Sequence, residues 1–321
     1  MKVNDRMINK KMVNSEFMDS DRAVALRFPA EWERQSGVML ALPSIATDWA
    51  PLLERVHETY ANIIKYISRY EKVLLLCQKT SQGKDFLRRF DLDVKNIKIV
   101  QVPYNDTWTR DYGPLTVLCD KRPVLLDFMF NGWGLKFAAD RDNVVTKSLY
   151  KSKIFKSDVR LSNGPLVFEG GSVESDGEGT LLVTGKCLLS ANRNPALSKD
   201  DIEKILLHVF GAKRVFWLAN GELEGDDTDA HIDTLARLAP SDSIVYMRAP
   251  ISDHHYVSLK QMESELKKFK TVEGRSYNLV PLPLPTACFD SEGKRLPATY
   301  ANYLVINGAV LMPVYNDNKN D

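Results

Sequence analysis

The chain has few cysteines, almost no net charge and no long apolar run. Its 321 residues include 4 cysteines. Cys77, Cys119 and Cys187 lie in or beside apolar runs without C-x-x-C spacing, which argues against a disulfide framework or a structural zinc site. The formal net charge of +1 argues against a nucleic-acid partner, because such proteins carry a basic stripe. No window approaches membrane-spanning length. These absences favour buried free thiols, a cytoplasmic location and a small-molecule partner.

The chain also lacks a signal peptide pattern and an internal linker. Residues 1–26 are rich in Lys, Asp, Glu and Asn and have no apolar central region, so we expect a flexible N-terminal tail. Residues 27–321 contain no Pro- or Ser-rich stretch, which predicts a single domain. The only proline cluster, Pro281, Pro283 and Pro285, is interpreted as a short extended loop.

From Ser36 onward, short apolar strands alternate with amphipathic helices. Strands are expected at 38–42, 73–76, 97–102, 124–128, 181–184, 215–218 and 244–247, and helices at 51–70, 200–210 and 258–269. Two hairpins, 115–118 with 124–128 and 303–306 with 309–313, fit poorly with a doubly wound sheet. The pattern predicts a mixed α/β fold of radially arranged modules.

Three polar clusters lie far apart in the chain: residues 108–114, 169–171 and 227–233. In the last cluster, His231 and Asp233 are two residues apart, so a strand running on to residue 238 would place both on one face. An ordinary surface strand is the alternative. Potential metal ligands occupy every second position of this cluster: Asp227, Asp229, His231 and Asp233. The turn glycine of a calcium loop and a second histidine are missing. We therefore expect no metal here.

The other two clusters suit an organic cation. Glu169 follows an apolar run and precedes two glycines that allow close approach, although an exposed hairpin corner is the alternative. Asp111 lies beside Trp108, which would place a carboxylate next to an aromatic wall. The alternative is a surface ion pair of Arg110 with Asp111. Trp133, flanked by glycines, fits either the same pocket or a packed loop.

In their order along the chain, these motifs resemble the agmatine deiminase branch of the guanidine-modifying pentein enzymes, a branch that is like the peptidyl-arginine deiminases. The resemblance rests on W-x-R-D-x-G-P at 108–114, F-N-x-W-G at 130–134, E-G-G at 169–171 and D-x-T-D-x-H-x-D at 226–233. Residues 28–33 and 296–303 add to it. The family implies a five-bladed α/β propeller of ββαβ modules, with the last module incomplete in these residues.

The resemblance implies that agmatine and water are converted to N-carbamoylputrescine and ammonia without a metal or organic cofactor. A guanidinium group calls for carboxylates, and by resemblance Asp111 and Asp233 supply them. A cysteine thiolate attacks the guanidine carbon, His231 protonates the departing ammonia and activates water, and Glu169 orients the reacting groups. The remaining substrate-binding residues are expected to be Trp108, Trp133 and Asp227. A homodimer is the candidate assembly.

Two features depart from the family pattern. The nucleophile of the family belongs to a G-x-x-H-C segment beyond the hairpin at 303–313, and residues 1–321 do not contain that segment. Cys288 lies before the hairpin, without glycines or a neighbouring histidine, and does not fit an activated thiolate. Ala230 stands where the family has glycine. Two alternatives therefore remain open: deimination of arginine within a peptide, and guanidine binding without catalysis.

Overall fold

The strands form five separate sheets within residues 25–317 and 319–321, which this computed structural model describes. The first sheet is parallel and contains β2 (Gly37–Ala41), β3 (Lys72–Cys77) and β4 (Ile97–Gln101). The second has the order β1-β5-β6-β7, with β1 (Leu26–Arg27), β5 (Leu115–Cys119), β6 (Arg122–Met129) and β7 (Arg160–Val167). The third has the order β10-β9-β8, with β8 (Val173–Ser175), β9 (Thr180–Thr184) and β10 (Arg214–Leu218). The fourth contains β11 (Ala236–Ala239), β12 (Ser243–Arg248) and β13 (Asn278–Pro283), and the fifth is the hairpin β14 (Leu304–Ile306) with β15 (Ala309–Leu311).

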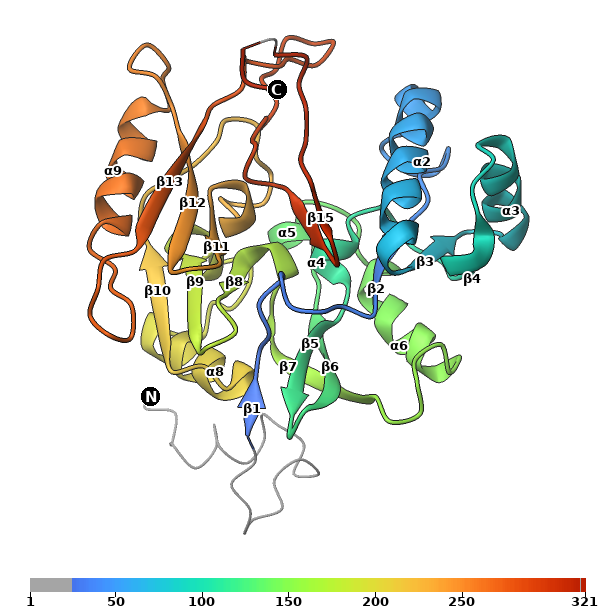
Figure 1. The fold of residues 1–321 in the computed structure, drawn as a ribbon, viewed down its shortest axis with the longest axis horizontal. Helices are drawn as coiled ribbons and strands as arrows, with labels where there is room; N and C mark the ends of the chain where they lie inside the picture. Colours follow the sequence, from blue (N-terminus) through green and yellow to red (C-terminus); the bar gives the residue numbers. More distant parts are fainter. Residues whose placement is uncertain (1–24, 318) are drawn as a thin grey trace.

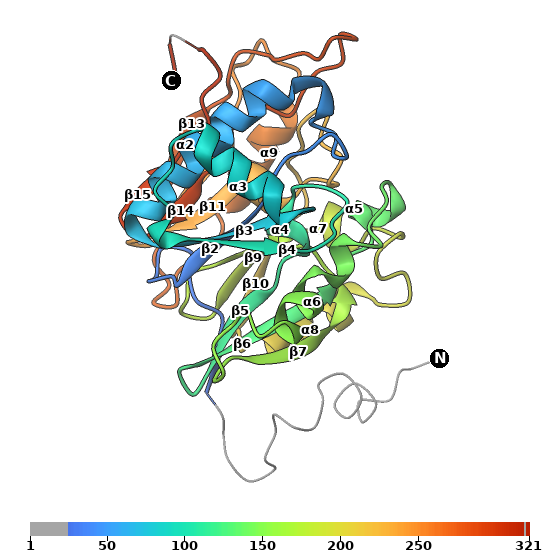
Figure 2. The same cartoon turned by 90° about the vertical axis from the view of Figure 1, so that its right-hand side faces the viewer.

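The longer helices lie at the rim of the molecule, and two of the short ones lie near its middle (Figure 1). The rim helices are α2 (Leu53–Tyr70), α3 (Thr80–Arg89), α6 (Val145–Lys151), α8 (Lys199–Phe210) and α9 (Tyr256–Leu266). The short helices are α4 (Thr109–Tyr112), α5 (Gly132–Leu135) and α7 (Gly185–Leu188), and the 3-10 turns are η1 (Ala50–Leu52), η2 (Val94–Asn96), η3 (Asp142–Val144), η4 (Gly170–Ser172) and η5 (Ile232–Thr234). Figure 2 shows α2 and α3 covering one face of the β2-β3-β4 sheet. No helix among the described residues is long and apolar enough to cross a membrane.

The expected mixed α/β fold is confirmed, and five small sheets are compatible with five modules. Both predicted hairpins are antiparallel pairs, β5 with β6 and β14 with β15. The expectation of a loop at the proline cluster is wrong. Pro281 and Pro283 belong to strand β13, which pairs with β12 in parallel. Prolines are tolerated there because β13 lies at the edge of its sheet, where a missing N–H breaks no ladder. Of the predicted tail, residues 1–24 fall outside the described residues, and Leu26 pairs with Cys119 in β1.

Local sequence signals explain where the rim helices begin and end. Helix α8 begins after Ser198, whose side chain accepts a hydrogen bond from the backbone N–H of Asp201, and the Asp201 carboxylate accepts one from the Ser198 N–H. It ends at Gly211, which takes the left-handed conformation with φ 61°. A side chain at Gly211 would also collide with the carbonyl of Leu26. This close contact fixes the helix end against strand β1.

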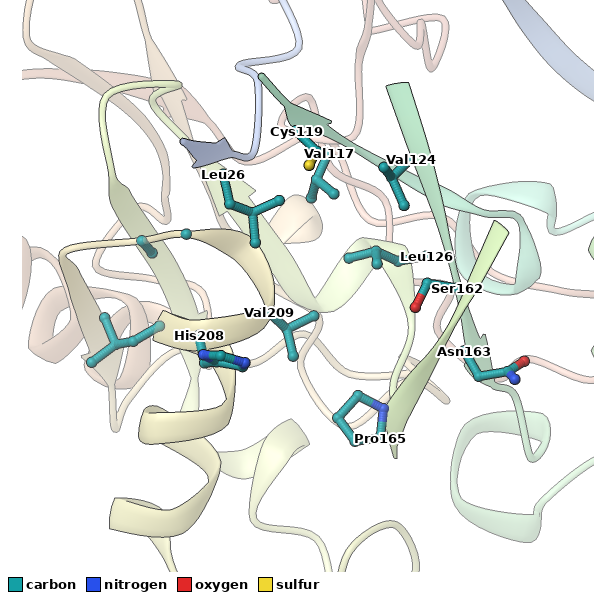
Figure 3. Close-up of a pocket in the computed structure, with 13 residues that line it drawn as sticks. Leu26, Val117, Cys119, Val124, Leu126, Ser162, Asn163, Pro165, His208 and Val209 are labelled. Carbon is teal, nitrogen blue, oxygen red and sulfur yellow. The ribbon is translucent and has the colours of Figure 1, made fainter. Parts of the chain in front are cut away.

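The buried apolar residues form four clusters, and three of these clusters combine residues from two sheets. Next to one of these clusters, a cavity of about 360 Å³ opens between the β5-β6-β7 sheet and the end of α8 (Figure 3). Leu26, Val117, Leu126 and Val209 give it a mostly apolar wall. None of the predicted site residues lines it.

Charged side chains, of which Glu174 and Arg237 are buried, link distant segments of the chain. We call Glu31, Arg110, Glu174 and Arg237 the central ion cluster. Arg237 donates from Nε to Glu174 Oε1 at 2.6 Å and from Nη2 to Glu31 Oε2, while Arg110 lies 3.3 Å from Glu31 and 3.5 Å from Glu174. Arg237 also donates to the Tyr303 carbonyl at 2.7 Å. The cluster thereby joins segments from residue 31 to residue 303.

Replacing Arg237 by Met is expected to reduce the free energy of unfolding by about 3–5 kcal/mol, because it leaves Glu174 buried without its closest cation. Urea unfolding followed by circular dichroism measures the loss. Arg88→Met is the control: Arg88 pairs with Asp85 at the surface and should contribute about 0–1 kcal/mol. Equal losses in the two variants would contradict a central role for Arg237.

Candidate functional site

Asp111 is held at the site by two hydrogen bonds from distant segments. It lies on the one-turn helix α4 and is 8% exposed. Its Oδ2 accepts from Trp133 Nε1 at 2.9 Å, and its Oδ1 accepts from the Gly171 N–H at 2.9 Å. Trp133 reaches Asp111 because the backbone is left-handed at Gly132, Trp133 and Gly134, with φ 55° at Trp133 itself. An L residue held in that conformation is typical of functional sites.

The glycines after Glu169 are required by close contacts. Glu169 follows β7 and Phe168 and precedes η4. A Cβ at Gly170 would lie 2.1 Å from the Arg110 carbonyl oxygen. A Cβ at Gly171 would lie 2.6 Å from His231 Nδ1 and 2.8 Å from both Asp111 Oδ1 and Asp233 Oδ2. Three of the four predicted catalytic side chains therefore converge on Gly171, and only glycine leaves room for them.

His231 and Asp233 reach the site by a different route from the one expected. They are not on a strand, because His231 precedes the 3-10 turn η5 and β11 begins only at Ala236. The preceding loop is closed by Asp226, whose Oδ2 accepts from the Ala230 N–H at 2.7 Å. Ala230 has φ 66°, a conformation that glycine adopts at less cost. The alanine is therefore accommodated within a loop geometry that suits glycine.

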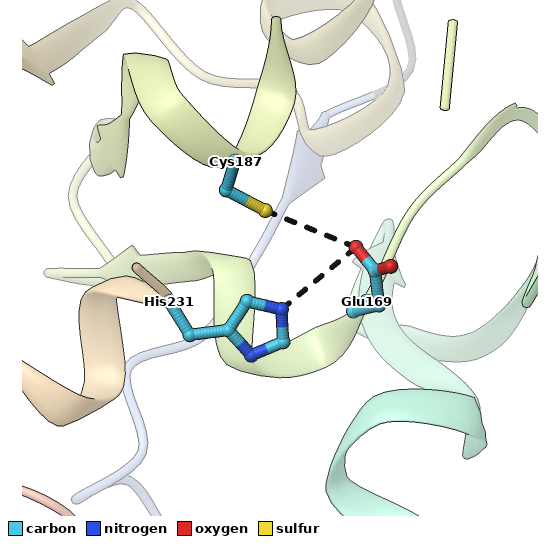
Figure 4. Close-up of side chains that lie close together, drawn as sticks. All are labelled: Glu169, Cys187 and His231. Atoms are coloured by element: carbon cyan, nitrogen blue, oxygen red, sulfur yellow. Dashed lines mark hydrogen bonds and ion pairs between the residues drawn. The ribbon is translucent and has the colours of Figure 1, made fainter. Parts of the chain in front are cut away.

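Glu169 connects His231 to two residues that no sequence motif marked, Cys187 and Arg193. Figure 4 shows Cys187 Sγ and His231 Nε2 both directed at Glu169 Oε2, at 3.9 and 3.8 Å. Arg193 Nε donates to both Glu169 oxygens, at 2.9 and 3.0 Å, and its Nη1 donates to Asp229 at 2.6 Å. The apolar surroundings of Cys187 and the loop position of Arg193 gave no signal of this proximity.

Burial and nearby charges shift the pKa values of the site residues. Burial disfavours the charged form of His231, but the charge of Asp111 and the contacts with Cys187 and Glu169 raise its pKa well above the usual value. Burial tends to raise the pKa of Glu169, and His231 and Arg193 lower it overall. Burial raises the pKa values of Asp233 and Cys187. The site therefore pairs a protonated imidazole with an ionised Glu169.

Two buried polar atoms of the site have no hydrogen-bond partner in the described part of the chain: His231 Nε2 and Asp233 Oδ1. Buried polar groups are nearly always paired, so such atoms mark positions where a bound group would complete the hydrogen bonding. They belong to two side chains that flank the same glycine. The arrangement can offer an acceptor and a proton donor to one polar ligand.

Trp108 and Asp227 lie further out than the other predicted residues. Trp108 is 44% exposed, with its ring 6.5 Å from that of Trp133. Asp227 is exposed, and its carbonyl oxygen accepts from Lys136 Nζ at 2.6 Å. The structure thus brings Asp111, Glu169, His231 and Asp233 together with Trp133, whereas Trp108 and Asp227 are exposed.

Comparisons with known proteins point to one family. Residues 27–321 match the family model of Porphyromonas-type peptidyl-arginine deiminases. The agmatine deiminase of Pseudomonas aeruginosa is 30% identical over 322 residues, which cover 93% of this chain and 86% of the relative. A cysteine-to-serine variant of the C. jejuni agmatine deiminase, solved with substrate bound, has a TM-score of 0.85 and 38% identity over 93% of this chain and 85% of that chain. The agmatine deiminase of Enterococcus faecalis has a TM-score of 0.79 and 27% identity, covering 92% of this chain and 85% of that one.

The raised pKa of His231 predicts a pH-dependent contribution to stability. Its stabilising effect is fully present below the unfolded pKa, about 6.5, and is lost as the pH rises through the higher folded value. The difference in unfolding free energy between the wild type and His231→Gln should therefore shrink as the pH rises above about 6.5 and through the higher folded pKa. Urea unfolding at several pH values measures it, with the exposed His208→Gln as control. A difference that is constant or grows with pH would refute the assignment.

Proposed function

Because the chain belongs to the Porphyromonas-type peptidyl-arginine deiminase family, we propose that it acts on a small guanidinium compound and that agmatine is this substrate. The observation that supports the proposal most directly is the unpartnered Asp233 Oδ1, buried beside Asp111 and His231. A guanidinium group carries N–H donors in one plane and no acceptor, so it matches carboxylates that still lack a donor. The indole of Trp133 adds an aromatic wall, against which a planar cation is stabilised.

The proposed reaction follows from the protonation states of the site residues. A cysteine thiolate adds to the guanidine carbon, and His231, which its neighbours keep protonated, passes a proton to the departing ammonia. The neutral imidazole then takes a proton from water, which attacks the thiouronium carbon and releases the thiolate and N-carbamoylputrescine. Glu169 orients the imidazole, while Arg193 keeps Glu169 ionised.

None of the four cysteines has the setting of an activated nucleophile. Burial raises the pKa of Cys77 to about 12, and it also raises that of Cys187, which lies behind Glu169. Cys119 is on β5 and lines the separate apolar cavity. Cys288 Sγ donates to the Thr286 carbonyl. The described residues therefore support guanidinium binding and proton transfer, and the thiol step needs a group beyond them.

Agmatine is favoured over arginine within a peptide by the relatives. The Pseudomonas aeruginosa and C. jejuni relatives are agmatine deiminases, and the substrate-bound C. jejuni protein carries serine in place of a cysteine. Substrate binding in that protein therefore does not require that thiol. Titration with agmatine and with an arginine-containing peptide distinguishes the two substrates here.

Asp233→Asn is expected to weaken agmatine binding by about 1.5–3 kcal/mol, since one charge-assisted hydrogen bond becomes neutral. Isothermal titration calorimetry measures the change. Asp200→Asn, at an exposed position on α8, is the matched control and should bind agmatine like the wild type. Unchanged affinity in Asp233→Asn would remove Asp233 from the substrate site.

A polypeptide of residues 1–321 is expected to bind agmatine without releasing ammonia or a ureido product, because none of its thiols is poised for attack. Ammonia and ureido assays on the purified polypeptide test this. The Cys187→Ser and Cys288→Ala variants identify a thiol if turnover occurs. Turnover that one of these substitutions abolishes would show that the thiol concerned is the nucleophile.

A further inference from the structure

Three side chains with different metal-ligand atoms meet at one point of the structure. Glu169, Cys187 and His231 each offer one ligand atom, and these atoms all lie within 4.8 Å of one another. Cys187 Sγ is 3.9 Å and His231 Nε2 is 3.8 Å from Glu169 Oε2 (Figure 4). Zinc bonds of about 2.0–2.3 Å at tetrahedral angles place ligand atoms about 3.3–3.6 Å apart. Small side-chain movements would therefore bring the three atoms to the distances that an ion requires.

The imidazole is already oriented for such a role. His231 Nδ1 lies 3.5 Å from Asp111 Oδ1, whereas Nε2 is buried without a hydrogen-bond partner and faces Glu169. Metal-binding histidines usually present one ring nitrogen to the ion and the other to a carboxylate, which fixes the ring. Asp111 is itself held by Trp133 and the Gly171 N–H. The unpartnered nitrogen is thus aimed into the space between the thiol and the carboxylate.

The carboxylate is oriented in the same way. Arg193 Nε binds both Glu169 oxygens, so Glu169 can turn Oε2 toward an ion while Oε1 keeps its hydrogen bond. Arg193 is neutralised in turn by Asp229, at 2.6 Å. A thiolate, a carboxylate and a neutral imidazole carry two negative charges, which balance a divalent cation.

We propose that Cys187, His231 and Glu169 bind a divalent transition-metal ion of the zinc type, with a fourth coordination position left open. A thiolate, an imidazole and a carboxylate oxygen are the ligand types that zinc prefers. The thiol proton and the Nε2 proton pass to solvent as the ion binds. The ion is not a cofactor of the proposed deimination. It occupies the ring nitrogen that the deimination would use, so agmatine turnover and metal binding exclude each other if both proposals hold.

Cobalt(II) is the probe, because thiolate ligation gives it a near-ultraviolet charge-transfer band that oxygen and nitrogen ligands alone do not. The wild-type protein is expected to show this band at saturating cobalt, and zinc should remove it by displacement. Cys187→Ser should lose the band, whereas Cys119→Ala, which changes a thiol in β5, should keep it. Asp111→Asn should weaken zinc binding about 10- to 100-fold, as expected when the partner of a ligating histidine is lost.

Absence of the band in the wild type, or its persistence in Cys187→Ser, would overturn the proposal. Circular dichroism checks that each variant is folded. If Cys187→Ser does not fold, cadmium NMR of the wild type decides the question: the resonance must couple to the Cys187 β-protons and to the His231 ring. No guanidine compound is present in these experiments, so failure of metal binding and failure of agmatine binding are separate outcomes.

Discussion

The rest of the structure depends on the central ion cluster, in which Arg237 and Glu174 are buried. Apolar clusters join neighbouring sheets, and the ion pairs among Glu31, Arg110, Glu174 and Arg237 connect segments that lie far apart in the sequence. Buried charges are costly unless each is paired, so the modules must meet in one arrangement to satisfy them. Arg110 also lies 3.7 Å from Asp233, which couples this arrangement to the candidate site.

The candidate site keeps some of its polar groups unsatisfied while the surrounding structure satisfies the others. Arg193 and Trp133 occupy acceptors of Glu169 and Asp111, and this fixes the two carboxylates in place. His231 Nε2 and Asp233 Oδ1 remain without partners. Buried polar atoms are nearly always paired, and a guanidinium group at Asp233 Oδ1 or a metal ion at His231 Nε2 would supply a partner. The same feature therefore underlies both proposals.

Much of the fold could be predicted from local patterns, and the exceptions have physical reasons. Short apolar runs and amphipathic spacing report local geometry, so β9 and α8 were predicted within a few residues. The strand at 278–283 was missed because its prolines argue against a strand, although an edge position tolerates them. The turn η5 was missed because His231 and Asp233 are two residues apart, a spacing that is typical of a strand. A 3-10 turn can also present both of these side chains.

The sequence by itself singled out four candidate site residues, since its motifs carry Asp111, Glu169, His231 and Asp233 together with the glycines beside them. Only the tertiary structure decided that Cys187 and Arg193 join them, that Asp227 is exposed, and which polar atoms stay unpaired. The bond from Gly171 to Asp111 spans 60 residues, and that from Arg237 to Glu31 spans 206. Contacts across such separations depend on how whole modules pack, and periodicity along the chain carries no information about that packing.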